Sequence, residues 1–449
     1  MAPMKTLLPP IEIAREGDGA TLLCLSRRDV PKCAGWLGCA GGQLLQRRGQ
    51  GDLAAMAAEL FSEGPAGVDP LAWRRELEQD AITAGVQAAP GQWVGHLGCL
   101  SEDLPAAADR LAALLAGPAL DAGRWKQIVR RHRGAMAEQL AQPAEMIRHL
   151  PSRQVLGPDH PNAQAPHAKV VAAHRHADAA AMARAAFQRR GSVFAAIGGD
   201  VSAEDGFDLL RTLTGLVAPA DAPLPPEPAP APSPADVWVM DLPKTTQAFV
   251  ALSRVGVRAG DPDRLALRLA VRILGGGLTG RLMRRVRGEM GQTYGISASL
   301  PEQPARTPFA IQTFTRLDNL PRMLELIDAV LTETAAEGFT DEEIDTARRY
   351  LHGSLPLGLT SPSAVLRFVA DGMRAGLTLD DIEADWRAIL DTGADAIHAA
   401  ARRLIGDGHF HLAVIAPAKE VLPAVADRGT VATFRFRNPP DRWPNRRKQ

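Results

Sequence analysis

Hydrophobic positions along the chain follow two different periods. Apolar residues recur every three or four positions in one stretch, which predicts an amphipathic helix containing Leu265, Ala266, Leu269, Ala270 and Ile273. Short apolar runs predict strands at 36–42, 192–197, 247–257 and 411–415. Strands followed by runs of helices favour an α+β fold, so we expect antiparallel-rich sheets, each covered on one face by helices.

Residues 218–236 interrupt these patterns with eight prolines. Because proline fixes φ and lacks the backbone donor, this stretch forms neither a helix interior nor a central strand. We therefore predict a semi-rigid, exposed linker between an N-terminal lobe, residues 1–217, and a C-terminal lobe, residues 237–449.

The two lobes carry matching features, which indicates a duplication. Asp121 and Thr340 each follow a turn and are predicted to cap a long helix, with Thr340 and Glu343 forming a capping box. A glycine stands thirteen residues after each cap, at Gly134 and Gly353. Two homologous lobes joined by the linker are the economical interpretation.

Composition excludes several classes of protein. The 449 residues contain 51 Lys plus Arg and 51 Asp plus Glu, so no overall field attracts nucleic acid. The sequence contains no apolar stretch of the ~20 residues that span a membrane, and no secretory h-region near the N-terminus, so we expect a cytoplasmic protein. The four cysteines contain no C-x-x-C pair and are expected to be buried free thiols.

The eleven histidines include no pair at i, i+4 beside a carboxylate on a predicted helix, and the serine-hydrolase, NTPase and dinucleotide motifs are absent. The distinctive segment is 273–299, where three glycines precede a basic helix, expected at 278–286, and a strand at 294–298. By itself it is also compatible with an ordinary helix–loop–strand that exposes a basic face.

This segment resembles one found in the insulinase–pitrilysin metallopeptidases. The similarity rests on an arginine and a tyrosine seven residues apart and on the positions around them: Gly275, Gly276, Gly277, Arg281, Leu282, Arg287, Gly291 and Tyr294. Residues 157–161, 194–200 and 338–344 are also similar to family elements, so the resemblance covers most of the chain.

The chain departs from the family at the metal motif. Active members carry H-x-x-E-H in the first half, and the aligned stretch here is 51–64. Ala54 and Ala58 occupy the two histidine positions and Ala57 the position of the general base. Glu59 is one residue out of place, which turns its side chain by about 100° around a helix. Glu138 lies near the position of the distal ligand and is expected to be a surface charge.

The resemblance implies a division of labour between two chains. Family members enclose a peptide between two bowl-shaped halves, and small bacterial members can place the zinc motif in one chain and the Arg/Tyr pair in another. This chain would be the metal-free subunit, with no cofactor of its own and no activity alone, beside a partner of similar size that carries H-x-x-E-H and zinc. Arg287 would hold a substrate carbonyl and Tyr294 would assist the carbonyl under attack, beside a substrate loop of Gly275, Gly276, Gly277 and Arg281.

Bacterial two-subunit members suggest a small ribosomally made precursor as the substrate, including that of pyrroloquinoline quinone. Three alternatives remain open. The chain could be a structural core subunit, a homodimeric peptide-binding protein without catalysis, or an enzyme of another class.

Overall fold

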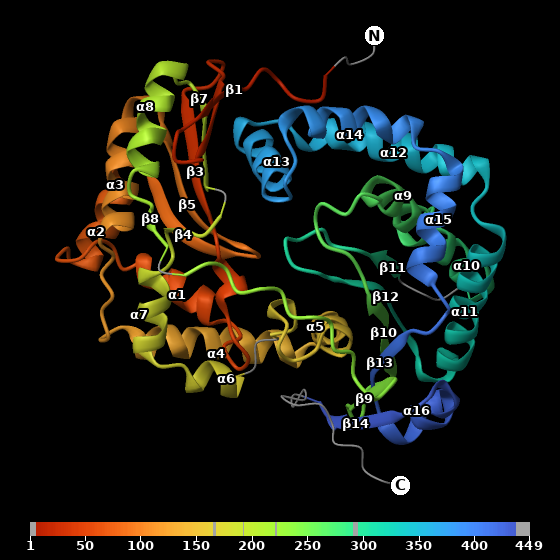
Figure 1. Ribbon diagram of the computed structural model, residues 1–449. Coiled ribbons are helices and arrows are strands. Elements are labelled where there is room, and N and C mark those ends of the chain that lie inside the picture. The colour runs from red at the N-terminus through yellow and green to blue at the C-terminus, as the bar shows by residue number, and fades with distance from the viewer. Residues whose placement is uncertain (1–5, 165–167, 192, 221, 291–294, 437–449) are drawn as a thin grey trace. The chain divides into compact units, whose positions relative to one another are not determined.

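The computed structural model describes residues 6–164, 168–191, 193–220, 222–290 and 295–436 (Figure 1). The chain forms two compact units, each made of three separate segments. The first unit contains residues 1–134, 168–226 and 354–384, and the second contains 135–167, 227–353 and 385–449. The chain thus passes between the units five times, once within the predicted linker.

The first unit is built on a six-stranded sheet with the order β1-β2-β7-β3-β5-β4. Its pairings are antiparallel except for the parallel pair β2–β7. The strands are β1 (Glu12–Arg15), β2 (Thr21–Ser26), β3 (Lys32–Ala40), β4 (Thr83–Ala89), β5 (Gln92–Leu100) and β7 (Val193–Gly199). The short strands β6 (Gln188–Arg189) and β8 (Ala218–Pro219) form a separate parallel pair. The helices are α1 (Leu53–Phe61), α2 (Pro70–Gln79), α3 (Leu104–Ala116), α6 (Ala168–Ala173), α7 (His176–Arg184), α8 (Ala203–Thr214) and α13 (Pro362–Arg374), with 3-10 turns η1 (Gly42–Leu45) and η2 (Ser101–Asp103).

The second unit has its own six-stranded sheet with the order β11-β12-β10-β13-β9-β14. The strands are β9 (Val237–Asp241), β10 (Gln247–Val255), β11 (Ile296–Ser299), β12 (Pro308–Arg316), β13 (His411–Ala416) and β14 (Val431–Arg435). The helices are α5 (Pro143–Leu156), α9 (Arg264–Gly275), α10 (Arg281–Met290), α11 (Leu320–Glu337), α15 (Ala394–Ile405) and α16 (Ala418–Val425), with 3-10 turns η3 (Pro161–Ala163), η4 (Leu317–Asn319) and η5 (Ala426–Arg428). Three helices contribute to both units, namely α4 (Trp125–Ala141), α12 (Asp341–Gly358) and α14 (Leu379–Asp391).

The two sheets share one topology. The series β2-β7-β3-β5-β4 and the series β9-β13-β10-β12-β11 both place five successive strands in the order first, fifth, second, fourth, third. The four strands predicted from apolar runs are β3, β7, β10 and β13, so these predictions and the α+β fold class are confirmed.

Helices pack on both faces of the first sheet, whereas the sequence pattern predicted helices on one face only. Successive residues of a strand point to opposite faces. A Cβ atom at Gly206 of α8 would lie 3.1 Å from Ile197, and one at Gly198 would lie 2.8 Å from Leu366 of α13. Helices α8 and α13 therefore cover opposite faces at β7.

Helices α5 and α13 occupy equivalent places in the duplication, because each follows a long helix that contains a central glycine. Helix α5 comes from the first half of the chain but packs against β10, β12 and β13 of the second unit. Helix α13 comes from the second half and packs against β2, β3 and β7 of the first unit. Each half of the chain thus supplies a helix to the sheet formed mainly by the other half.

The predicted capping box is confirmed at α12. The backbone N–H of Thr340 donates to the Glu343 carboxylate at 3.0 Å, and the N–H of Glu343 donates to the Thr340 hydroxyl at 3.3 Å. The prediction for Asp121 is wrong. Its carboxylate accepts the N–H of Gly123 at 2.8 Å in a local turn, and α4 begins later, at Trp125.

The second part of the Pro-rich segment follows α5 and η3 within the second unit. The N–H of Ser233 donates to the Gln154 carbonyl at 2.7 Å, and that of Ala231 to the Leu156 carbonyl at 3.1 Å. Glu227 accepts from the backbone N–H of Arg306 at 2.6 Å and lies 3.0 Å from Nε2 of His160. In the described part of the chain, no helix is long and apolar enough to cross a membrane.

Candidate functional site

The positions aligned with the family's metal motif lie on α1 and carry only methyl groups. Ala54 and Ala57 are fully buried, and Ala58 is 7% exposed. The N–H of Ala54 is already bonded to the Gln46 side chain at 2.8 Å. Alanine offers no nitrogen, oxygen or sulfur for a metal, so these residues do not fit the family's zinc.

The charged residues beside these alanines bind one another. His132 of α4 places Nδ1 2.5 Å from Asp52 and Nε2 2.6 Å from Glu59, and Arg131 also pairs with Glu59. Because a carboxylate only accepts hydrogen bonds, both contacts are hydrogen bonds when the ring carries two protons. We call Asp52, Glu59, Arg131 and His132 the α1–α4 clamp; it joins the degenerate motif to α4.

Nothing in the sequence singles out His132, since it lies among three arginines, Arg130, Arg131 and Arg133. Glu138, aligned near the distal ligand, is exposed on α4, as expected for a surface charge. Among the residues that the structure describes, no group of three or more His, Cys, Asp or Glu side chains is arranged to hold a metal.

The three glycines of the predicted substrate loop lie where α9 ends. A Cβ atom at Gly275 would stand 2.4 Å from the backbone nitrogen of Ala298 in β11. One at Gly276 would stand 2.6 Å from the Arg272 carbonyl oxygen, and Gly277 has φ +78°. Packing and backbone conformation therefore already require glycine here, independently of any contact with substrate.

Arg281 is bound inside the second unit rather than free at its surface. It pairs with both carboxylate oxygens of Glu343 and donates to the Thr334 hydroxyl at 3.0 Å. Its guanidinium also lies 5.0 Å from the centre of the Phe339 ring. Burial alone would raise the pKa of Glu343, but hydrogen bonds from Arg281 and the Thr340 N–H outweigh it and hold that pKa below its ordinary value. Arg281 joins α10 to the start of α12.

Arg287 differs from the other arginines of α10. Arg284 pairs with Glu343, and Arg285 pairs with Glu289 and Glu333. Arg287 is exposed, and its guanidinium has no hydrogen-bond or ion-pair partner among the described residues. Tyr294 and Gly291 lie outside the described residues. Of the predicted Arg/Tyr pair, the structure therefore describes only Arg287. The predicted basic helix is α10, and β11 begins two residues after Tyr294.

The cysteines are free and buried, as the sequence predicted. Burial raises the pKa of Cys39 and of Cys99 to about 12. The thiolate, rather than the thiol, is the nucleophile and metal ligand. These two thiols are therefore unsuited to nucleophilic chemistry at neutral pH.

Comparison with known families finds one similarity. Residues 189–351 match the domain described as the peptidase M16 inactive domain. Over these residues the chain is similar to the M16 peptidase family. This is the insulinase-like family that the sequence resembled, and the matched region contains the glycine loop, α10 and the start of α12.

Other proteins show the same similarity. An uncharacterized zinc protease of Streptomyces coelicolor is 29% identical over 180 residues, which are 39% of this chain and 38% of that protein. The match thus spans about two fifths of the relative's length. The peptidase M16 inactive domain from Pseudomonas fluorescens has 25% identity and a TM-score of 0.80, covering 91% of this chain and 98% of that one. The periplasmic protease PqqL from Escherichia coli shares the fold, with 16% identity and a TM-score of 0.73, over 92% of this chain and 46% of that protein.

Proposed function

We propose that this chain is the metal-free subunit of a two-chain M16 peptidase. The observation that carries the proposal is a contrast within α10. Arg281, Arg284 and Arg285 are held by carboxylates, whereas Arg287 is exposed without a partner in the described part of the chain. An unpaired arginine has its hydrogen-bond donors available for a ligand.

In this proposal Arg287 and Tyr294 bind the backbone of a peptide. Arg287 donates a charge-assisted hydrogen bond to a substrate carbonyl, and Tyr294 donates its phenolic hydrogen to the carbonyl that is attacked. The buried alanines at positions 54, 57 and 58 leave the metal to a second chain. That partner would be a protein of similar size that carries H-x-x-E-H and zinc.

The contacts of Arg281 reduce the number of residues in the proposed substrate loop that can bind the peptide directly. Since Arg281 is bound to Glu343 and Thr334, it would stabilise the loop, while Arg287 would bind the peptide. We further propose a small ribosomally made peptide as the substrate and the cytoplasm as the compartment. Fractionation of cells that express the tagged protein tests the compartment.

The test is reconstitution with the H-x-x-E-H partner and a labelled peptide. A hydrogen bond to a charged group contributes ~1.5–3 kcal/mol, so Arg287→Ala should lower kcat/KM roughly 10- to 100-fold. Tyr294→Phe removes only the hydroxyl and should act mainly on kcat, by up to ~100-fold. Zinc analysis should find the metal with the partner and not with this chain.

Arg285→Ala is the matched control, because it removes an arginine from the same helix that is paired within its own unit. It should leave cleavage within about twofold of wild type, since surface ion pairs contribute ~0–1 kcal/mol. If the partner cleaves equally fast alone, the chain is a scaffold or structural subunit. Normal cleavage by the Arg287 and Tyr294 variants in an intact complex would refute the gripping role.

A further inference from the structure

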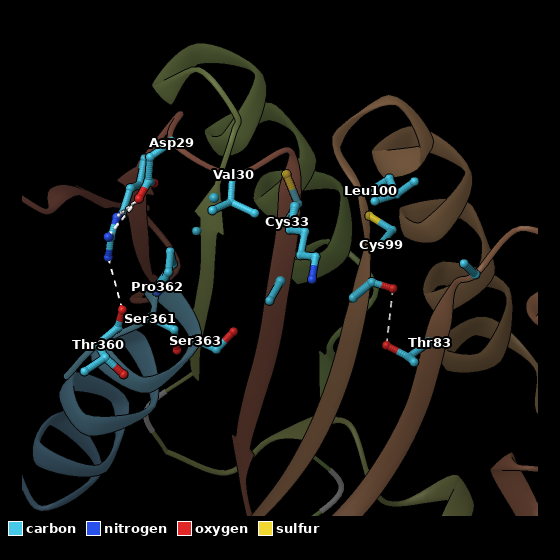
Figure 2. A pocket seen from close by; sticks show the side chains of 17 residues that line it. Asp29, Val30, Cys33, Thr83, Cys99, Leu100, Thr360, Ser361, Pro362 and Ser363 are labelled. Carbon is cyan, nitrogen blue, oxygen red and sulfur yellow. Dashed lines mark hydrogen bonds and ion pairs between the residues drawn. The ribbon is translucent and has the colours of Figure 1, made fainter. Parts of the chain in front are cut away.

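A hollow of about 510 Å³ lies within the first unit, at one end of its sheet (Figure 2). Small-molecule sites commonly have volumes of ~300–1,000 Å³. Figure 2 shows the start of α13, with Ser361, Pro362 and Ser363, on one side and Thr83 and Leu100 on the other. The hollow involves neither the degenerate motif nor α10.

Small residues of three neighbouring strands lie at one level in the floor of the hollow. Ala34 of β3 is directly opposite Gly98 of β5 and Gly198 of β7. Register partners point to the same face of a sheet, and Gly198 faces α13. A Cβ atom at Gly98 would lie 2.7 Å from the Thr83 hydroxyl oxygen, and one at Gly198 would lie 2.8 Å from Leu366, so Thr83 and α13 close over the two glycines on either side of Ala34.

The rim of the hollow exposes apolar side chains. Val30 is 47% exposed and Leu100 is 38% exposed, although both are large hydrophobic residues. An apolar rim around Ala34 favours an apolar group, because binding such a group removes apolar surface of both partners from water.

Among the described residues that line the hollow, one cation has no ion-pair partner. Arg27 pairs with Asp29 at 2.8 Å and donates to the Thr360 carbonyl at 3.3 Å. Lys32 is exposed, and its ammonium group has no hydrogen-bond or ion-pair partner in the described ranges. With two cations and one anion, the lining has a net charge of +1. The free cation favours a ligand with one negative charge.

We infer that this hollow binds the C-terminal residue of a peptide, with its apolar side chain over Ala34 and its carboxylate at Lys32. The identification of the ligand as a peptide rests on the proposed function. A small apolar carboxylic acid offers the same chemistry, so the experiment includes both sources.

The experiment measures peptide binding to the isolated full chain by fluorescence anisotropy. The probe is a labelled octapeptide that ends in leucine as the free acid, and the comparison peptide has the same sequence with a C-terminal amide. Because a hydrogen bond to a charged group favours the acid, we expect it to bind at least ~10-fold tighter than the amide. Lys32→Ala should remove this preference. Ala34→Phe should weaken both peptides by filling the floor.

Lys126→Ala is the matched control, since Lys126 is an exposed lysine of α4 that does not line the hollow. It should leave both affinities unchanged. Equal binding of acid and amide, or an unaltered preference in Lys32→Ala, overturns the inference. If N-acetyl-leucine competes with the probe as strongly as the unlabelled peptide does, the hollow binds small carboxylic acids. That result would overturn the inference that its ligand is a peptide. No partner or zinc is needed, so failure here is distinguishable from failure of the reconstituted cleavage.

Discussion

At the scale of single residues, the positions aligned with the family's metal motif take part in packing, and the charged residues beside them pair with one another. The alanines of α1 are buried in the core of the first unit. His132 lies between the carboxylates of Asp52 and Glu59. A carboxylate that loses its partner in a half-buried place is destabilising, because its hydration is not fully restored. The clamp therefore stabilises the contact between α1 and α4.

His132→Ala should lower the free energy of unfolding by about 1–3 kcal/mol, since Asp52 loses its ring contact and Glu59 keeps only Arg131. Urea unfolding followed by tryptophan fluorescence measures the change. Arg133→Ala is the control, because Arg133 is exposed and has no ion pair among the described residues. A His132→Ala protein as stable as the control would show that the clamp contributes nothing.

At the scale of elements, the two central glycines of α4 and α12 lack a packing reason. Among the described residues, a Cβ atom at Gly134 or Gly353 would have no atom within 4 Å other than the backbone of its own helix. These are also the points at which the chain passes from one compact unit to the other. Glycine in a helix interior is less favourable than alanine by roughly 0.5–1 kcal/mol.

Gly134→Ala and Gly353→Ala should therefore each stabilise the protein by about 0.5–1 kcal/mol in urea unfolding. Gly206→Ala in α8 is the contrasting helix variant, because its Cβ would lie 2.8 Å from the Cys24 sulfur. That variant should destabilise the protein. Loss of stability in the Gly134 and Gly353 variants would mean that these glycines serve a conformation other than the straight helix.

At the scale of the whole molecule, buried histidines make stability depend on pH. Burial lowers the pKa of His96, His149, His160 and His411 below the ordinary value. For His160 the geometry agrees, since Nδ1 accepts the Asn162 N–H at 3.2 Å and Nε2 faces Glu227. This arrangement requires a neutral ring with its proton on Nε2.

The unfolded chain binds protons at these histidines near their ordinary pKa of about 6.5, whereas the folded chain binds them only at lower pH. Stability should therefore be complete above that value and decrease as the pH falls below it. Urea midpoints at pH 7.5 and 5.5 test this, and the lower pH should give the lower midpoint. His160→Gln should reduce the difference, because the variant does not titrate at this position. A midpoint that does not fall at pH 5.5 would contradict the argument.

Local patterns in the sequence were sufficient for many elements of the fold. Apolar runs located β3, β7, β10 and β13, and the spacing of Thr340 and Glu343 located the start of α12, because strand alternation and helix capping act over a few residues. The same kind of local pattern gave a wrong prediction at Asp121, because its side chain forms a turn with Gly123 instead of capping the helix. The alanines at the positions of the family's metal motif could also be identified from the sequence, because the residue type alone shows that a side chain cannot bind metal.

The tertiary structure alone decided which charges are free and which surfaces are hollow. Arg281 and Arg287 look alike in the sequence, but Glu343 holds the first from 62 residues away. The exchange of α5 and α13 between the sheets, and the register that aligns Ala34, Gly98 and Gly198, likewise join distant segments. The sequence by itself determined the elements and the absence of ligands at the motif, because those depend on neighbours along the chain. Ion pairing, sheet register and helix exchange depend on neighbours in space, and only the folded chain specifies them.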